Sequence, residues 1–206
     1  TLHHLDPFLH PEALVTDAGS TKHAIVSTAR KNITKAQFLG GHPMAGKERR
    51  GVEVADPDLF RDRTWVLTPG SPEELETPIA RDFQSWLDRI GARMTILGAS
   101  QHDWIVAYTS HLPQLASTGL AATVGENVSN GEELKISGPG LADTTRLALS
   151  SYDLWRDILA TNAEAIEQAL TAYIGKLEHL RENLRTRQIR EEFDRAATLA
   201  ATLRQR

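Results

Sequence analysis

Short apolar runs alternate with amphipathic stretches along the first half of this chain. A run such as Trp65-Val66-Leu67 predicts a buried strand, and the stretches between the runs have the spacing of helices. Strands that alternate with helices indicate an α/β fold whose sheet is parallel or mixed. The predicted strands lie at 13–17, 37–41, 64–68 and 92–97, and the predicted helices lie at about 21–31 and 72–90.

The pattern changes after Gly98, where the strands stop and Leu and Ala dominate. Residues 99–125 predict one long apolar helix that is perturbed at Pro113, because proline has no N–H to donate to the carbonyl four residues back. After a turn at 137–140, two more helices are expected to run to the C-terminus. We therefore predict an α/β domain at 1–97 followed by an all-α domain at 98–206.

The last segment has apolar residues at spacings of four and three, which place them on one helical stripe. The stripe predicts either packing within one subunit or, because so long a helix would overrun the side of its own domain, an interface between two subunits. A homodimer through the helical domain is therefore expected. The stripe consists of Ile166, Leu170, Tyr173, Leu177, Leu180 and Leu184, followed by Ile189, Phe193, Ala196, Ala200 and Leu203.

Composition and charge exclude several classes of protein. With 23 Lys and Arg against 27 Asp and Glu, the formal net charge is −4, so the chain has no field that would hold a nucleic acid. No apolar run approaches the roughly 20 residues that a membrane span needs. The absence of cysteine excludes disulfides, thiolate metal sites and a cysteine nucleophile. It also suits a reducing compartment, and the cytoplasm is the expected location.

His42 lies in a turn with glycines on both sides, Gly40 to Gly46, directly after a predicted strand. The glycines let the backbone approach a ligand, and Pro43 stiffens the turn. Open α/β sheets bind ligands at the carboxyl ends of their strands, and a histidine whose pKa is near neutrality can act as a general base. His42 is therefore a candidate catalytic base, and a histidine that only caps the turn is the alternative.

The first predicted strand ends in a second turn, Asp17 to Ser20. Ser20 is the expected N-cap of the following helix, where its hydroxyl would accept from a backbone N–H. From a neighbouring strand end it could also reach a ligand held by His42. Lys22, in the first helical turn, opposes the helix dipole and so hints at another use.

Polar residues also interrupt the apolar helices of the second half. His111 and Gln114 share a helix face, and they either line a cavity or form hydrogen bonds within the core. Asp143 is expected to be an N-cap. Arg146 either forms a local ion pair with Asp143 or clamps a substrate carboxylate.

Several common site motifs are missing, namely GxGxxG, the Walker loop and HExxH. A buried strand as early as 13–17 needs neighbours that little preceding sequence can supply, so we expect the chain to be the C-terminal part of a longer protein. No metal site is predicted, because the one conceivable cluster would lie in a segment expected to fray. That cluster comprises His3, His4, Asp6 and His10.

Taken together, these segments resemble prephenate and arogenate dehydrogenases, the oxidoreductases that make tyrosine precursors. The segments occur in the family's order and at its spacing from residue 13 to about 180. It implies the second half of a Rossmann-type dinucleotide-binding domain, without its glycine-rich loop, followed by a helical dimerisation domain. The segments are Asp17 to Lys22, Gly40 to Gly46 with Glu48 and Gly51, Trp65 to Pro69, His102-Asp103, Ser110 to Pro113, Asp143 to Arg146 and Leu154 to Asp157.

The resemblance implies the oxidative decarboxylation of prephenate to 4-hydroxyphenylpyruvate with NAD or NADP, although without the glycine-rich loop the chain is expected to bind the cofactor poorly. It implies His42 as the base or hydrogen-bond acceptor for the ring hydroxyl, with Ser20 beside it, and Arg146 as the carboxylate clamp. The other implied residues are His111, Gln114, Glu48 and Trp155 around the substrate, and Ser20, Asp17, Gly41 and Pro43 around the cofactor.

Two positions depart from the family pattern. The family often has a second histidine where Gln114 stands, and a Lys or Arg where Ala142 stands. Loss of a cation beside Arg146 would weaken recognition of a dicarboxylate and could favour arogenate, so an arogenate dehydrogenase that gives tyrosine directly is one alternative. A non-catalytic helical dimerisation module is the alternative from a different class.

Overall fold

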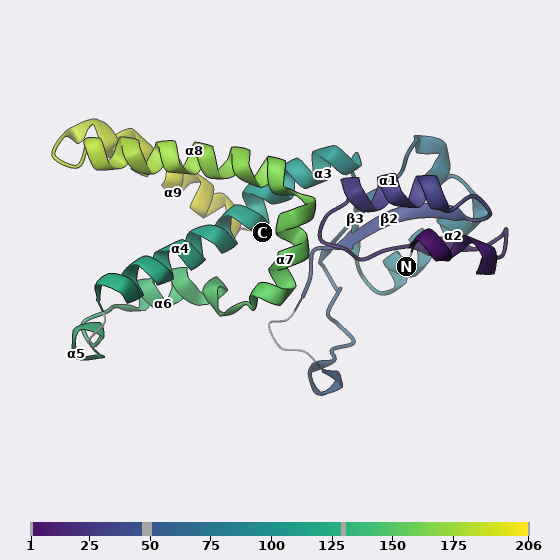
Figure 1. The fold of residues 1–206 in the computed structure, drawn as a ribbon, viewed down its shortest axis with the longest axis horizontal. Helices are drawn as coiled ribbons and strands as arrows, with labels where there is room; N and C mark the ends of the chain where they lie inside the picture. The colour runs from purple at the N-terminus through teal and green to yellow at the C-terminus, as the bar shows by residue number, and fades with distance from the viewer. Residues whose placement is uncertain (1, 47–50, 129–130, 206) are drawn as a thin grey trace. The chain divides into compact units, whose positions relative to one another are not determined.

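The computed structural model describes residues 2–46, 51–128 and 131–205, apart from the side chain of Arg187. Contacts divide the chain into two compact units, Thr1–Ile166 and Glu167–Arg206. The larger unit contains the sheet and most of the helices (Figure 1). All of the site residues predicted from the sequence belong to the larger unit.

Four strands form one sheet in the order β1-β2-β3-β4. β1 (Leu14–Thr16) is parallel to β2 (Gln37–Pro43), β2 is antiparallel to β3 (Thr64–Thr68), and β3 is parallel to β4 (Arg93–Ile96). The mixed sheet confirms the predicted α/β fold. Because β1 and β2 are parallel, the turn after β1 and the end of β2 meet at the same edge of the sheet.

Helices α1 (His23–Asn32) and α2 (Pro78–Arg89) cover opposite faces of the sheet (Figure 1). Successive strand residues point to opposite faces. Leu39 belongs to the buried cluster that includes side chains of α2, whereas a Cβ on Gly40 would lie 3.0 Å from Cγ2 of Val26 in α1. Glycine at position 40 therefore lets α1 lie close to the strand that carries His42.

The helix predicted at 72–90 is divided in two. Pro72–Leu75 forms a short 3-10 turn, η4, and α2 begins only at Pro78. Thr77 caps α2 by accepting a hydrogen bond from the backbone N–H of Ala80 (3.3 Å). Proline is tolerated in the first turn of a helix but not in its interior, so the second proline sets the true start.

The apolar helix predicted at 99–125 is confirmed in outline, with a π-helical turn inside it. α3 (Ala99–Val106), the π turn η5 (Ala107–His111) and α4 (Leu112–Asn127) follow one another without a gap. Pro113 lies in the first turn of α4, where its missing N–H is tolerated. The perturbation therefore falls in the preceding turn, and π turns of this kind often mark functional sites.

The expectation of only two further helices is wrong. Apolar periodicity continues across short breaks at 150–151 and at 162, so periodicity alone does not reveal them. Asp143 lies inside α6 and is not its N-cap. The elements are α5 (Gly131–Leu134), α6 (Pro139–Thr145), η6 (Arg146–Leu149), α7 (Tyr152–Thr161), α8 (Ala163–Glu182), η7 (Arg187–Ile189) and α9 (Arg190–Arg204).

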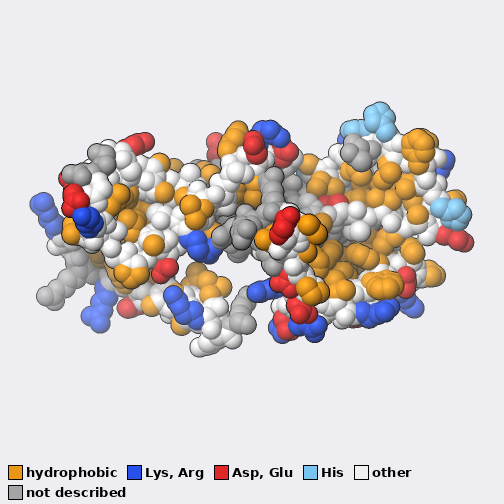
Figure 2. Space-filling model, turned by 90° about the horizontal axis from the view of Figure 1, so that it is seen from below, with side chains coloured by type: hydrophobic (Ala, Val, Ile, Leu, Met, Phe, Trp, Pro, Cys, Tyr) orange, Lys and Arg blue, Asp and Glu red, His pale blue; other side chains and the backbone are white. Residues whose placement is uncertain are grey.

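The remaining elements are three 3-10 turns: η1 (Leu2–His4), η2 (Asp6–Phe8) and η3 (Val52–Val54). None of the described helices has the length and apolar character that crossing a membrane requires. On the face shown in Figure 2, acidic and basic side chains are interspersed.

Candidate active site

A pocket of about 320 Å³ lies where the turn after β1 and the end of β2 meet the helices of the larger unit. Its volume is that of a site for a small ligand. The pocket brings together five of the residues singled out in the sequence, namely Ser20, His42, Pro43, His111 and Trp155. Its other lining residues are Met44, Ala45, Gly46, Ser110, Leu154 and Ile158.

His42 is the first member of a chain of three buried side chains. Its Nδ1 lies 2.8 Å from Nε2 of His102, and Nδ1 of His102 lies 2.7 Å from Oδ1 of Asp103. The three residues are at most 9% exposed. Since His42 ends β2 while the other two belong to α3, the chain fixes the imidazole from behind and leaves its far side to the pocket.

Asp103 also caps α1 from a distance of about 80 residues along the chain. Its carboxylate accepts hydrogen bonds from the backbone N–H groups of Lys22 (2.7 Å) and His23 (2.8 Å). The expectation that Ser20 caps this helix is therefore wrong, because Asp103 already takes the N–H groups, and Ser20 lines the pocket. Burial would raise the pKa of Asp103, but the bonds from His102 and from the two N–H groups lower it overall, so the carboxylate is ionised.

Lys22 is fully buried and forms an ion pair with Asp17. Burial lowers the pKa of Lys22, and the carboxylate of Asp17 opposes that shift. Asp17 also accepts from the backbone N–H groups of Gly19 (2.9 Å) and Gly41 (3.1 Å). Asp17 and Gly41 therefore tie the ends of β1 and β2 together behind the pocket, and they are not among its lining residues.

Both histidines of the pocket are neutral at physiological pH. Burial, with a smaller effect from the neighbouring His102 and Lys22, lowers the pKa of His42 to about 3. Burial likewise lowers the pKa of His111 to about 4, and Asp103 opposes that shift. The near-neutral pKa expected for His42 from its residue type is thus wrong, because the strand end and α3 remove it from water.

His111 ends the π turn and is 1% exposed. Its Nδ1 lies 3.2 Å from Nδ2 of Asn162, and the same Nδ2 donates to the backbone carbonyl of Asp103 (2.8 Å). The ring of Trp155 stands edge-on to the His111 ring, with centroids 5.8 Å apart. The indole Nε1 of Trp155 is buried and has no hydrogen-bond partner among the described residues.

The other predicted residues lie elsewhere. Gln114 is buried in α4 and donates to the backbone carbonyl of Leu147 (2.8 Å). Arg146 is exposed in η6 and is not a lining residue of this pocket. Glu48 lies outside the described residues.

The sequence analysis missed His102, Asp103 and Asn162 as site residues. The signal for the first two was a pair of adjacent polar residues inside an apolar helix, and for Asn162 it was only a helix break. Apart from the bond between the neighbours His102 and Asp103, their partners lie 51 to 81 residues away, so no local pattern shows which side chains they contact.

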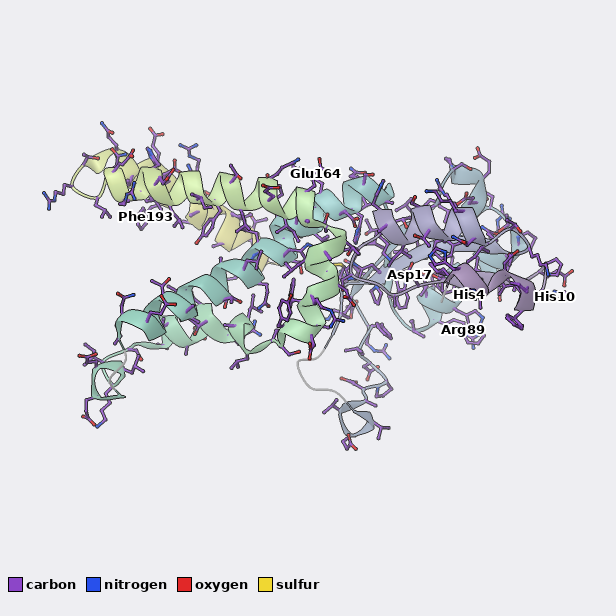
Figure 3. The ribbon with its side chains drawn as sticks, viewed as in Figure 1. His4, His10, Asp17, Arg89, Glu164 and Phe193 are labelled. Atoms are coloured by element: carbon purple, nitrogen blue, oxygen red, sulfur yellow. The ribbon has the colours of Figure 1, made fainter. Side chains whose placement is uncertain are left out.

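No group of three or more His, Cys, Asp or Glu residues that could hold a metal ion occurs in the described part of the chain. The carboxylate of Asp6 accepts hydrogen bonds from the backbone N–H groups of Thr34 (2.7 Å) and Lys35 (2.9 Å). Figure 3 shows His4 and His10 apart from one another.

Comparisons with known proteins give a consistent result. The nucleotide-binding domain model of prephenate dehydrogenase matches residues 1–96, and the dimerization domain model of the same enzyme matches residues 98–203. A cyclohexadienyl dehydrogenase from Zymomonas mobilis is 32% identical over 85% of this chain and 60% of its own length. A prephenate dehydrogenase from Bacillus subtilis is 31% identical over 82% of this chain and 46% of its own length. The chain thus spans between about half and three fifths of these relatives.

Two solved structures resemble almost the whole chain. Arogenate dehydrogenase from Synechocystis has a TM-score of 0.79 and 30% identity, over 99% of this chain and 73% of that one. Prephenate dehydrogenase from A. aeolicus, solved with hydroxyphenyl propionate and NAD+, has a TM-score of 0.82 and 30% identity, over 99% of this chain and 70% of that one.

Proposed function

Because this chain belongs to the prephenate dehydrogenase family, we propose that it takes part in the NAD- or NADP-dependent oxidative decarboxylation of prephenate to 4-hydroxyphenylpyruvate. The observation that supports this most is His42, a neutral imidazole that lines a pocket and is held from behind by His102 and Asp103. A neutral imidazole can accept a hydrogen bond from a substrate hydroxyl, which an imidazolium cannot.

The reaction explains why a weak base is enough. Ring carbon C4 of prephenate carries a hydroxyl and the hydrogen that leaves as hydride, and the electron pair of the bond to the ring carboxylate enters the ring as carbon dioxide leaves. The product keeps the hydroxyl as a phenol, so no proton is lost overall. As the hydride departs, the hydroxyl becomes strongly acidic, and an acceptor whose pKa is about 3 strengthens its bond at that moment.

Ser20 and Trp155 complete the polar wall. Ser20 belongs to the turn after β1 and lines the same pocket as His42, so its hydroxyl is available to the substrate or to the nicotinamide ring. The buried indole N–H of Trp155 has no partner among the described residues, which costs free energy. A turn of the side chain would let this N–H donate to an oxygen of the substrate. Arg146 is exposed and does not line this pocket, so its proposed role as a clamp for a substrate carboxylate rests on the family resemblance.

The residues present fit one end of a dinucleotide. NAD or NADP, when bound, accepts the hydride. α1 begins beside the pocket, but its first N–H groups are bonded by Asp103 and so do not hold a phosphate. Ser20 and Pro43 can contact the nicotinamide end from the pocket wall, and Asp17 and Gly41 act from behind by holding the two strand ends.

The helical segments have a second proposed role. We propose a domain boundary near 97/98 and a homodimer formed through the helical domain, with the exposed apolar side chains of α8 and α9 at the interface. Leu177 in α8, Leu184 just after it and Phe193 in α9 are 46–68% exposed in the structure, which supports a covered face in the assembly. Without the proposed chemistry, the chain would be only such a dimerisation module.

Arogenate is the alternative substrate. Its side chain carries an ammonium group, and the absence of a cation at Ala142 leaves Arg146 without a neighbouring positive side chain at that position. Measurement of kcat/KM for prephenate and for arogenate with the intact enzyme decides between them. A strong preference for prephenate would contradict this alternative.

The substitution His42→Asn, made in the full-length protein, tests the proposed reaction. We expect kcat with prephenate to fall by roughly 10²–10⁴ while KM changes little, because the acceptor for the hydroxyl is lost. The matched control is His179→Asn, which changes a histidine of α8 outside the pocket and should leave kcat unchanged. If kcat is retained in His42→Asn and only stability falls, His42 is structural and the proposal is wrong.

A further inference from the structure

The direction of the hydrogen bonds determines which nitrogen of His42 carries the hydrogen. The ionised carboxylate of Asp103 can only accept, so His102 donates to it through Nδ1–H. When this Nδ1–H is the one hydrogen on the ring, as in the Asp–His pairs of catalytic triads, the lone pair of His102 is at Nε2. That atom accepts from Nδ1–H of His42, so His42 keeps its own lone pair at Nε2.

The same reasoning gives the opposite result for His111. The backbone carbonyl of Asp103 can only accept, so the atom of Asn162 that faces it is the amide nitrogen. The second hydrogen of this amide points to Nδ1 of His111. Nδ1 of His111 therefore accepts, and the neutral ring carries its hydrogen on Nε2.

We propose that Asp103 sets the two pocket histidines in opposite tautomers. Its carboxylate acts on His42 through His102, and its backbone carbonyl acts on His111 through the amide of Asn162. As a result His42 offers the pocket a hydrogen-bond acceptor and His111 offers it a donor. Asp103 is thus a positioning residue that acts through two separate intermediaries.

This arrangement specifies a class of ligand. The ligand carries a hydroxyl that donates to His42 and, elsewhere in the same molecule, an oxygen that accepts from His111, such as a carboxylate oxygen. A ligand with two acceptors and no donor would leave His42 unpaired, which costs free energy in a buried site. The inference rests on the proposed function only where it identifies the donor as the ring hydroxyl of the substrate.

Burial keeps both rings neutral, and the nearby charges act in both directions. The ammonium of Lys22 favours the neutral form of His42, whereas the carboxylate of Asp103 opposes it. The carboxylate of Asp103 also opposes the neutral form of His111. A neutral ring is required at all three histidines, because an imidazolium has no lone pair and cannot accept.

Nitrogen NMR on wild-type protein with isotope-labelled histidine reads the tautomers directly and needs no substrate. At neutral pH we expect the hydrogen on Nδ1 in His42 and His102, and on Nε2 in His111. Single His→Gln variants assign the signals. An Nε2–H tautomer at His42, an Nδ1–H tautomer at His111, or an imidazolium at any of the three would overturn the proposal.

Two substitutions then test separately the link from Asp103 to His111 and the link from Asp103 to His42. Asn162→Leu removes the donor to His111 and should give it a mixture of tautomers, raise KM about tenfold and leave the tautomer of His42 unchanged. The matched control is Asn183→Leu, which removes an asparagine beside His179 outside the pocket and should change none of these. An unchanged His111 signal in Asn162→Leu would contradict the proposal.

The link from Asp103 to His42 is tested by His102→Phe, which removes the acceptor for Nδ1–H of His42. We expect His42 to move to its Nε2–H tautomer and kcat to fall about 10²-fold or more. His102→Gln supplies a carbonyl oxygen in place of the lost lone pair and should restore both the tautomer and much of kcat. If His102→Phe leaves the His42 tautomer as it is, the proposal fails. If the tautomers are as expected but the full-length protein with NAD or NADP does not oxidise prephenate, the proposed function fails and the role of Asp103 stands.

Discussion

The buried polar side chains of the larger unit are bonded differently from the exposed threonines of the smaller unit. In the larger unit, buried polar groups bond to residues far away along the chain, as Asp103 does with the N–H groups of Lys22 and His23. In the described part of the smaller unit, threonine hydroxyls such as those of Thr171 and Thr198 bond to a carbonyl four residues earlier in their own helix. Bonds of the first kind fix distant segments against one another, whereas bonds of the second kind are already satisfied by a single helix.

The apolar side chains also differ: those around the sheet of the larger unit are buried, whereas several in the smaller unit are exposed. The sheet of the larger unit buries Leu39, Leu67 and Leu87 almost completely, whereas Phe193 and Leu199 in α9 are 66% and 62% exposed. Exposed apolar side chains at this density are typical of a surface that a partner covers. The comparison supports the proposal that the larger unit holds the pocket and that the smaller unit binds a partner.

Removal of the central carboxylate should have the largest effect. We expect Asp103→Ala to lower the free energy of unfolding by about 3–5 kcal/mol, because it leaves two N–H groups of α1 and the imidazole of His102 without their partner. Urea denaturation measures this. The matched control is Asp194→Ala in α9, an exposed position where we expect a change within about 0.5 kcal/mol. Equal effects at the two positions would contradict the comparison.

The second largest effect should come from acid, which should lower the free energy of unfolding of the larger unit. The unfolded histidines take up protons near their ordinary pKa of 6.5, whereas His42 and His111 in the folded protein do so only near 3 and 4. The free energy of unfolding is therefore fully retained above about pH 6.5 and falls as the pH drops toward 4 and 3, by up to about 2.7 kcal/mol per pH unit when both groups contribute.

Urea denaturation at several pH values measures this slope. His111→Gln should reduce it by one proton, to about 1.4 kcal/mol per pH unit over the same range. A slope that does not change in His111→Gln would show that other groups cause the loss.

The sequence predicted the local parts of this molecule and missed the distant ones. The strand expected at 64–68 is β3, with the same bounds, because its apolar run and turns are encoded within a few residues. The N-cap expected at Ser20 was wrong because the competing acceptor, Asp103, lies 81 residues away from Lys22 in the chain. His42 and His111 could be singled out by residue type and context, but their neutral state depends on a burial that only the folded chain creates.

A substitution on the surface of the smaller unit should have a smaller effect, and this effect should be on self-association. Phe193 projects from α9 (Figure 3). We expect Phe193→Glu to weaken self-association at least about tenfold in Kd, or about 1.4 kcal/mol, without lowering the stability of the monomer. Sedimentation at a series of protein concentrations measures the dissociation constant. Thr198→Glu, about 140° around the same helix, is the matched control. If both variants behave like wild type, the apolar stripe is not the interface.

The smallest effect should come from a single long-range bond between hydroxyls. Thr161 donates to the backbone carbonyl of Asp157 (2.6 Å), so its oxygen accepts from the hydroxyl of Thr21 (2.8 Å). Thr21 is 4% exposed, and valine has nearly the same shape, so Thr21→Val should cost about 0.5–1.5 kcal/mol through the lost bond alone. Thr171→Val, which removes a hydroxyl bonded within its own helix, should cost less. A double-mutant cycle of Thr21→Val with Thr161→Val measures the coupling between the two hydroxyls. If the coupling is zero and Thr21→Val costs no more than Thr171→Val, then bonds between distant segments stabilise this unit no better than bonds within one helix.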